Sequence, residues 1–254
     1  MTIKTYTVNG VATIEIARPE KKNAITQAMY QAMADALRAA DADPAVRAVL
    51  ITGQPGIFTS GNDLEDFMAQ PPRGAEAPVF QFMRALTGCT KPVVAAVTGA
   101  AIGIGTTLLL HCDLVFVADD ARLAMPFVGL GLVPEFASSV LVPQLMGNRR
   151  AAEKLLLGDP FSGADAVECG IANKVLPAPE VVNYARRMAE RFNNLAPGAV
   201  RDTKALIAGP QREAVQAAIA REGEIFGARL RSPEAMEAFQ AFFQKRAPDF
   251  SKFD

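Results

Sequence analysis

The sequence contains few cysteines and no cysteine pair. Cys89, Cys112 and Cys169 are odd in number, lie far apart and form no CxxC motif. This spacing argues against a disulfide framework and against a cysteine-based zinc site. We therefore predict three buried thiols in a reducing compartment, and no bound metal.

The sequence also lacks a surplus of charge of either sign and any long apolar run. Lysine and arginine number 26 against 27 aspartates and glutamates, so the net charge is -1. This balance gives no overall positive field that would attract nucleic acid or an anionic membrane surface. The N-terminus has no apolar signal segment, and no run approaches the roughly 18 apolar residues of a membrane span. We predict a cytoplasmic protein whose partners include neither nucleic acid nor a membrane.

Histidine occurs once, as His111. A Ser-His-Asp triad would have to use this residue. It lies in the apolar stretch LLLHCD, and the sequence has no G-x-S-x-G nucleophile motif. We predict a structural role for His111.

Hydrophobic residues make up half of the 254 positions, and their spacing predicts an α/β core. Val8 and Val11 flank Asn9-Gly10, a pair typical of a two-residue hairpin turn. From Thr26, apolar residues recur every four positions, which predicts an amphipathic helix that ends near DADP. The segments AVLITG and KPVVAAVTG are apolar on both faces, as in parallel strands covered on both sides, and DLVFVA is a further strand followed by a turn.

The pattern changes after Arg149, where helical spacing dominates and only NKVL is typical of a strand. Pro179 and Pro233 stand at first-turn positions of predicted helices, where a missing N–H costs nothing. We predict a core over residues 1–195 and a C-terminal helical segment over residues 196–254. The mixed charges of REAVQAAIAREGEIFGARLR predict a solvated helical surface or a face against another subunit.

Two glycine-bearing turns, FTSGNDL and TGAAIGIG, each lead from a strand towards a helix. Free N–H groups and the helix dipole make such turns suited to binding negative charge. The second turn has Leu108 in place of the third glycine of a dinucleotide-binding motif, and no P-loop lysine follows it. Two interpretations stay open: close packing that glycine permits, or an oxyanion hole built from one N–H of each turn.

Five segments in order strengthen the second interpretation: PEKKNAIT, FTSGNDLEDF, KPVVAAVTGAAIGIG, CDLVFVADDARLAMPFVGLGLVPE and FFQKRAPDF. Together they resemble the crotonase superfamily, also called the enoyl-CoA hydratase/isomerase family, from about Tyr6 to Phe250. The resemblance implies an α/β, crotonase-like (ClpP/crotonase) spiral of ββα units with a C-terminal helical segment. It also implies an acyl-CoA thioester substrate, no cofactor beyond the coenzyme A of that substrate, and a homo-oligomer, either a trimer or a hexamer.

By motif position, the resemblance places the two oxyanion-hole donors on the backbone N–H groups of Asn62 and Ile104. Removal of a proton next to a thioester puts negative charge on the thioester oxygen, and the loss of one such donor typically costs about 2.7–4 kcal/mol. Arg246 falls, with the lysine before it, in a basic pair matched to the coenzyme A phosphates. The residues that the resemblance assigns to substrate or coenzyme A binding are Lys22, Asn23, Ala24, Ser60, Gly61, Asp63, Leu64, Phe127 and Lys245.

The catalytic side chain is assigned in the same way. Family hydratases use two glutamates, and Thr107 and Phe127 occupy those positions here. Glu135 instead matches the single base of the Δ3,Δ2-enoyl-CoA isomerases, most closely the peroxisomal type, although Phe136 stands where these usually have glycine. We expect apolar walls from Phe127, Val128, Leu130 and Phe136 to raise the pKa of this acid.

The predicted function is therefore isomerisation of 3-enoyl-CoA to 2-enoyl-CoA through a dienolate, in fatty acid degradation. A hydratase or another crotonase reaction in which Glu135 positions water is one alternative. A non-catalytic relative that binds acyl-CoA or RNA is another, and the near-neutral composition argues against RNA.

The segment after the first turn needs separate treatment. Asp63, Glu65 and Asp66 could be mistaken for a metal cluster, but the helix dipole favours acids in a solvated first turn. The stretch EDFMAQPPRGAEAPVFQF contains three prolines and a glycine, so we predict an irregular lid over the acyl pocket.

Overall fold

The chain begins with the predicted hairpin. In the computed structural model, which describes residues 2–72 and 74–253, β1 (Ile3–Val8) pairs antiparallel with β2 (Val11–Ile16). Asn9 and Gly10 both have positive φ, 49° and 71°, as a type I′ turn requires. The hairpin prediction is confirmed.

The hairpin continues into a six-stranded sheet of order β1-β2-β3-β5-β7-β10, in which all neighbours after the hairpin are parallel. Every residue of β3 and β5 is buried, as expected of strands covered on both faces. The strand predictions, NKVL included, are confirmed by β3 (Ala48–Thr52), β5 (Val93–Val97), β7 (Leu114–Ala118) and β10 (Lys174–Leu176).

A second sheet of short strands has the order β4-β6-β8-β9. The strands are β4 (Ile57–Thr59), β6 (Ala100–Ile102), β8 (Arg122–Ala124) and β9 (Phe161–Ser162). Residue spacing did not predict this sheet, and β9 contradicts the prediction that NKVL is the only strand after Arg149. Strands of two or three residues are too short for an alternating pattern, so pairing with neighbours defines them.

The first long helix, α1 (Gln27–Ala42), begins as predicted at Thr26, whose side-chain oxygen accepts the Met29 N–H at 3.3 Å. Met29, Met33 and Leu37 form its buried stripe. The other helices are α2 (Leu64–Ala69), α3 (Pro78–Gly88), α4 (Ile104–Thr107), α5 (Ser138–Met146), α6 (Asn148–Ala152), α7 (Gly163–Glu168), α8 (Val181–Glu190), α9 (Pro197–Ala208), α10 (Arg212–Arg229) and α11 (Pro233–Phe243).

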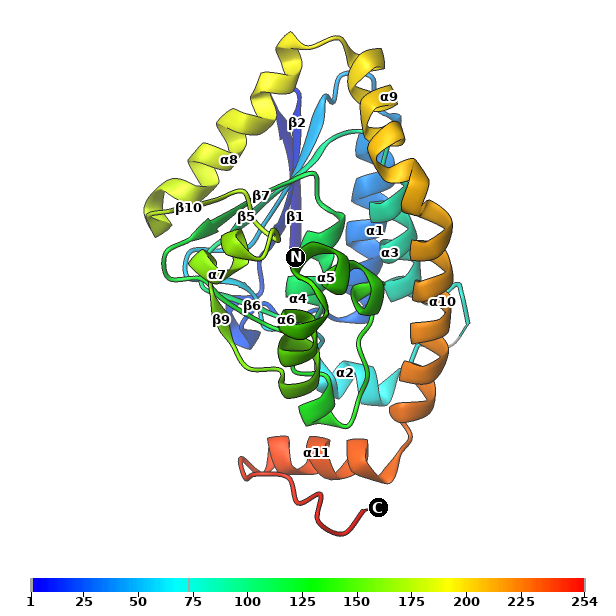
Figure 1. Ribbon diagram of the computed structural model, residues 1–254. Helices are drawn as coiled ribbons and strands as arrows, with labels where there is room; N and C mark the ends of the chain where they lie inside the picture. Colours follow the sequence, from blue (N-terminus) through cyan, green and yellow to red (C-terminus); the bar gives the residue numbers. More distant parts are fainter. Residues whose placement is uncertain (1, 73, 254) are drawn as a thin grey trace.

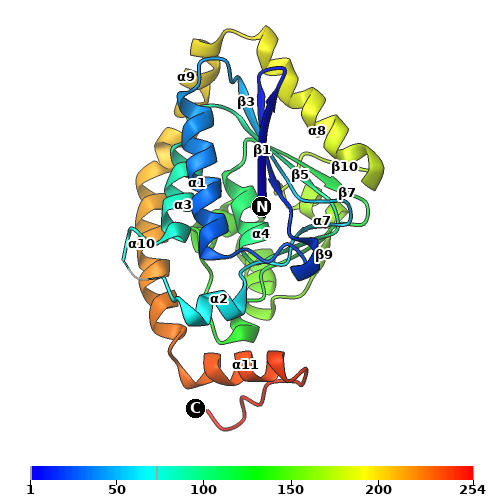
Figure 2. The ribbon, with the colours of Figure 1, turned by 180° about the vertical axis from the view of Figure 1, so that it is seen from behind.

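Helices cover the large sheet from two sides. Figures 1 and 2 place α8 on one side of the strands and α1, α3 and α10 on the other. The helix α8 packs against β2, β3, β5 and β7, whereas α1 packs against β1, β2 and α3. The core lies between these layers.

The C-terminal helices extend along this second layer. In Figure 1, α10 runs down the side of the molecule to α11, which lies across its lower end. Pro233 occupies the first turn of α11 as predicted, and Pro179 lies in the short turn Ala178–Glu180 before α8. The domain boundary after residue 195 stays a prediction, and so does assembly into a trimer or a hexamer. Across residues 2–72 and 74–253, no helix combines the length and apolar character needed to cross a bilayer.

Candidate active site

The two glycine turns lie side by side because the short strands that precede them pair. β4 and β6 are parallel neighbours, and Thr59 lies opposite Ala101. Gly61 has φ of 93°, and a Cβ built there would lie 2.9 Å from the Ile102 carbonyl oxygen. Only glycine permits both this conformation and this approach. Gly61 therefore allows close packing and also brings the two turns together, so the two interpretations of the glycines are compatible.

Each turn has one backbone N–H for which the described residues supply no acceptor. Gly61 O accepts from Ile25 N–H at 2.8 Å, and Asp63 N–H donates to Ile25 O at 2.9 Å, so the Asn62 N–H between them is not used in this pairing. Ile104 is the first residue of α4, where an N–H has no partner within the helix. Among the hydrogen bonds of the described residues, neither the Asn62 nor the Ile104 N–H finds an acceptor. These are the two donors that the family resemblance nominated.

Tyr30 holds the side chain of Asn62. The Tyr30 hydroxyl, on the buried side of α1, donates to Asn62 Oδ1 at 2.5 Å. Burial, and then the nearby Glu135 carboxylate, raise the pKa of Tyr30, so the phenol stays a donor. The sequence analysis did not identify this residue. Tyr30 follows Met29 of the predicted buried stripe, but no local pattern indicates a partner 32 residues away.

Glu135 is buried beside the turns. Its side chain is 6% exposed, and Oε1 accepts from the Thr107 hydroxyl at 2.5 Å. Burial raises the pKa of the Glu135 carboxyl to about 8, with a further rise from Glu222, while the Thr107 hydrogen bond opposes the rise. An acid with this pKa exchanges protons near neutral pH, as a general base must.

The loop after Glu135 takes an unusual path. Phe136 and Ala137 both have φ of 58°, in the left-handed region that favours glycine. His111 supports this conformation, because its Nε2 lies 2.8 Å from Phe136 O and its ring stacks on that of Phe136 at 3.9 Å. Burial lowers the pKa of His111 to about 4, so the ring is neutral and Nε2–H donates. The predicted structural role of His111 therefore takes a definite form: His111 supports the loop that carries Glu135.

A small cavity of about 30 Å³ lies against Glu135. Asn62 and Glu135 are the polar residues among the described residues that line it. The predicted wall is only partly correct, because of the four residues expected there the cavity is lined by Phe136 alone. Phe127 is buried next to Gly103, and Val128 is 43% exposed. The apolar lining comes instead from Phe67, Pro72, Val79, Phe80, Met83, Phe136, Ile219 and Phe226, mostly on α2, α3 and α10.

The residues nominated around Lys22 form a rigid loop. The Asn23 side chain accepts from Arg18 N–H at 2.7 Å and donates to the carbonyls of Ile57 and Phe58. Ala24 O accepts from Arg18 Nη1, and Ser60 N–H donates to Lys22 O. Lys22 itself is exposed. The loop is thus fastened to the first glycine turn, and the Asn23 side chain makes its hydrogen bonds within the protein.

Asp63 and Asp66 differ from the predicted solvated role. Asp63 is 7% exposed, accepts from Arg18 Nη1 at 2.6 Å and caps α2 through the Asp66 N–H. Asp66 Oδ2 accepts from the Gln27 N–H at 2.7 Å. Only Glu65 is exposed, and Leu64 is partly buried at the start of α2. The first turn of α2 is therefore tied to the loop after β2 and to α1, which a pattern of acids alone does not reveal.

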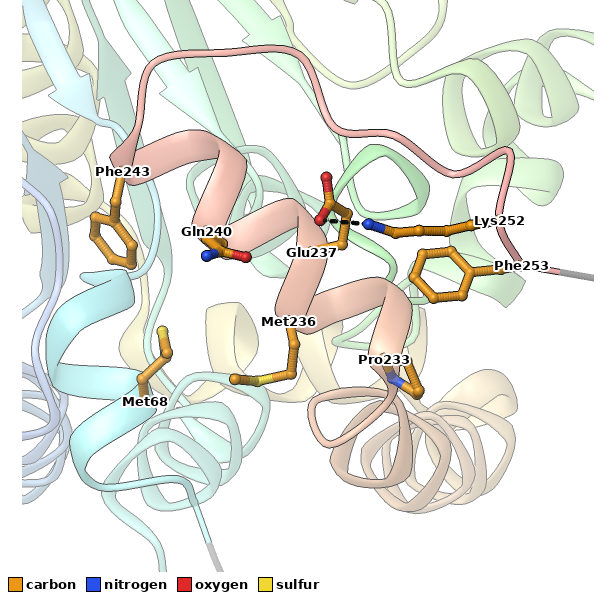
Figure 3. Close-up of a pocket in the computed structure, with 8 residues that line it drawn as sticks. All are labelled: Met68, Pro233, Met236, Glu237, Gln240, Phe243, Lys252 and Phe253. Atoms are coloured by element: carbon orange, nitrogen blue, oxygen red, sulfur yellow. Dashed lines mark hydrogen bonds and ion pairs between the residues drawn. The ribbon is translucent and has the colours of Figure 1, made fainter.

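A larger hollow of about 570 Å³ lies between α2 and α11 (Figure 3). Its charged residues, Glu237 and Lys252, pair with each other at 3.1 Å. No nominated residue lines it, and Lys245 is exposed after the end of α11. Arg246 pairs with Glu237 at 2.6 Å. The smaller cavity, which is lined by Glu135 and by Asn62 of the first glycine turn, is the candidate active site.

The predicted lid is partly ordered. Of the stretch from Glu65 to Phe82, the ends form α2 and the start of α3, and residues 70–77 between them contain no regular element where described. Position 73 of this predicted lid lies outside the described residues. Phe67, Val79 and Phe80 from its two helices line the cavity.

The Thr107 hydroxyl opposes the rise in the Glu135 pKa that burial causes, which gives a first prediction. Thr107→Val keeps the shape of the side chain and removes the hydrogen bond that lowers the Glu135 pKa. The titration of the buried carboxyl, followed by its infrared C=O band, should therefore move to higher pH. Thr107→Ser retains the hydroxyl and should titrate as wild type. An unmoved band in Thr107→Val would contradict this assignment.

The sequence and the fold are similar to those of known proteins. The profile of the Enoyl-CoA hydratase/isomerase family matches residues 6–252. Enoyl-CoA delta isomerase 2 of Homo sapiens is 34% identical over 94% of this chain, which spans 62% of the length of the human protein. The 2,3-dehydroadipyl-CoA hydratase of Escherichia coli is 30% identical, with 94% of each chain covered. The solved structure of Pseudomonas aeruginosa OdaA is 54% identical with a TM-score of 0.93, covering 95% of this chain and 98% of that one.

Proposed function

Because the chain belongs to the enoyl-CoA hydratase/isomerase family, we propose that it catalyses isomerisation of 3-enoyl-CoA to 2-enoyl-CoA, in fatty acid degradation. The crotonase fold and the enzyme class follow from the family match and the structural likeness. The choice of isomerisation among the family's reactions is our proposal. Relatives of similar identity carry isomerase and hydratase names, so names alone do not decide it.

The observation that carries the proposal is that one carboxylate faces the cavity. Glu135 is the acid among its described lining residues. Hydration of a double bond by the family's usual route needs an acid and a base, whereas the two positions that supply them hold Thr107 and Phe127. A second buried acid, Glu222, accepts two backbone N–H groups and does not line the cavity.

One carboxylate is sufficient for isomerisation. The Glu135 carboxylate takes a proton from C2, and the electron pair of that C–H bond moves into conjugation with the thioester. The resulting dienolate places negative charge on the thioester oxygen, which we assign to the N–H groups of Asn62 and Ile104. Glu135 then returns the same proton to C4, so that the double bond has moved and the carboxylate is restored.

The cavity must widen for this reaction. A volume of about 30 Å³ accommodates about one water molecule and no acyl chain. The ring of Phe80 closes the space, since a Cβ on Gly223 would lie 3.0 Å from it. We propose that the acyl chain enters between α3 and α10 by displacing this ring.

The proposal is tested by supplying the purified protein with 3-enoyl-CoA and, separately, with trans-2-enoyl-CoA. We expect the first sample to gain the absorbance of the conjugated thioester. The second should keep this absorbance, except for the small loss as the isomerisation reaches equilibrium. A substrate labelled with deuterium at C2 should deliver part of the label to C4, because one carboxyl moves the proton.

Two other results would redirect the assignment. Rapid loss of conjugated absorbance by addition of water would identify a hydratase. Binding of both thioesters without turnover would identify a non-catalytic acyl-CoA-binding protein.

A further inference from the structure

Glu222 is a buried acid for which the reaction above has no use. It lies on α10 among residues predicted to form a solvated surface or a face against another subunit, yet it is only 5% exposed within its own chain. That prediction is wrong at this position, and the sequence contained a signal against it. Glu222 falls three residues after Ile219 and four before Phe226, within the apolar stripe of the helix.

The Glu222 carboxylate accepts two hydrogen bonds from the loop that follows Glu135. Oε2 accepts from the Ala137 N–H at 2.6 Å, and Oε1 accepts from the Ser139 N–H at 2.9 Å. Ala137 is the N-cap residue of α5 and offers no side-chain cap of its own. The cap is therefore supplied by a helix 85 residues further along the chain. Ala137 lies two residues after Glu135, with only Phe136 between them.

These two hydrogen bonds hold a strained segment. Phe136 and Ala137 are consecutive non-glycine residues with φ of 58°, a conformation that costs free energy and needs support from its surroundings. His111 supports Phe136, and Glu222 supports Ala137. If the segment relaxed, the backbone of Glu135 would turn and its carboxyl would leave Thr107.

Charge links the two acids as well. Glu222 raises the pKa of Glu135. Burial raises the pKa of Glu222 itself. The hydrogen bonds from Ser139 and Ala137 and the charge of Arg221 oppose this rise. Titratable groups on two helices interact with one or the other of these acids. Arg221 lies beside Glu222 on α10. Tyr30 of α1 lies near Glu135, whose charge raises the pKa of the phenol.

We propose that Glu222 is a positioning residue for Glu135, through which α10 fixes the direction of the catalytic base. The inference rests on the proposed function, since it assumes that Glu135 is the base. Gly223 and Ile219 line the cavity and Glu222 does not. Glu222 therefore acts on the reaction through the loop and not by contact with the substrate.

The test compares Glu222→Gln with Glu224→Gln, which removes the same charge from an exposed position of the same helix. The glutamine amide cannot accept both N–H groups, so the loop should relax. We expect the high-pH plateau of kcat/KM to fall about 10- to 100-fold, on the order of the loss from a misplacement of about 1 Å. We also expect the acid limb to move to lower pH, because a negative charge near Glu135 is gone. Glu224→Gln should change neither.

A simple capping role would lower thermal stability without moving the acid limb, and that result would overturn the proposal. Wild-type plateau and limb in Glu222→Gln would overturn it too. If Glu222→Gln does not fold, Glu222→Asp, which keeps the charge on a shorter side chain, should lower the plateau and leave the limb in place. A wild-type plateau in that variant would count against positioning.

An infrared titration separates this inference from the proposed function. The buried carboxyl band that disappears in Glu135→Gln should titrate at lower pH in Glu222→Gln, whatever the substrate is. If turnover survives Glu135→Gln, the proposed function fails. If Glu135→Gln is inactive while the Glu222 variants behave as wild type in both kinetics and titration, only the positioning role fails.

Discussion

Glu135→Gln should lower the isomerisation rate about 100- to 10,000-fold, the usual contribution of a general base. Glutamine has the shape of the acid and can still pair with Thr107, but it cannot take a proton from C2. Thioester binding should change little, because the two backbone donors and the apolar walls remain. The rate is measured as the gain of conjugated thioester absorbance, and binding by calorimetry with a saturated acyl-CoA.

Glu180→Gln is the matched control, since it makes the same substitution at an exposed position of the short turn before α8. It should retain wild-type turnover. Turnover of Glu135→Gln within a few-fold of wild type would remove Glu135 from the reaction and leave the isomerase proposal without a base.

The same substitution should change the pH dependence of stability. The folded pKa of Glu135, about 8, lies above its ordinary value of 4.5. The stability that the neutral acid contributes is therefore fully present below pH 4.5 and is lost as the pH rises through 8. Glu135→Gln has no such loss. As the pH rises between these limits, the free energy of unfolding of Glu135→Gln should increase relative to that of wild type, by about a few kcal/mol at most.

Ile104→Pro should lower kcat/KM about 100- to 1,000-fold, the usual loss on removal of one oxyanion donor. A backbone donor cannot be deleted by an ordinary side-chain substitution, but proline has no N–H. Ile104 is the first residue of α4, a position that proline tolerates in helices because no helix hydrogen bond is broken. The residue before it, Gly103, has no Cβ to clash with the proline ring.

The control for this variant is Ile104→Val, which loses a similar amount of buried side chain and keeps the N–H. It should retain most of the activity, since a loss of one buried methylene costs only about 0.5–1.5 kcal/mol of stability. Circular dichroism and thermal unfolding of both variants check that the fold is kept. If folded Ile104→Pro turned over as fast as Ile104→Val, the Ile104 N–H would not be an oxyanion donor.

The parts of the fold with a strong local signal were predictable. Asn9-Gly10 has few alternatives to a tight turn between two valines, and the stripe of α1 has few alternatives to burial on one face. The second sheet was not predictable from spacing, because β9 has only two residues. The pairing partners of such strands come from distant parts of the chain, and no local pattern encodes them.

The candidate site divides in the same way. The two glycine turns were visible as turns, and their order in the chain matched a family motif. The wall of the cavity was predicted from the neighbours of Glu135 in sequence, yet α2, α3 and α10 supply most of it. Residues close in sequence to a buried acid follow the path of the loop, whereas the helices that close over it come from elsewhere.

By itself, the sequence determined the class of elements, the positions of the two glycine turns and the presence of Glu135 together with Thr107 and Phe127 at the positions of the hydratase pair. Those features depend on local backbone preferences and on residue identity, both of which are written in short segments. Only the tertiary structure decided that Thr107 bonds Glu135 across 28 residues and that Glu222 holds the base loop across 85. A side chain's pKa and direction depend on which groups surround it in space, and packing brings those groups together from separate parts of the chain.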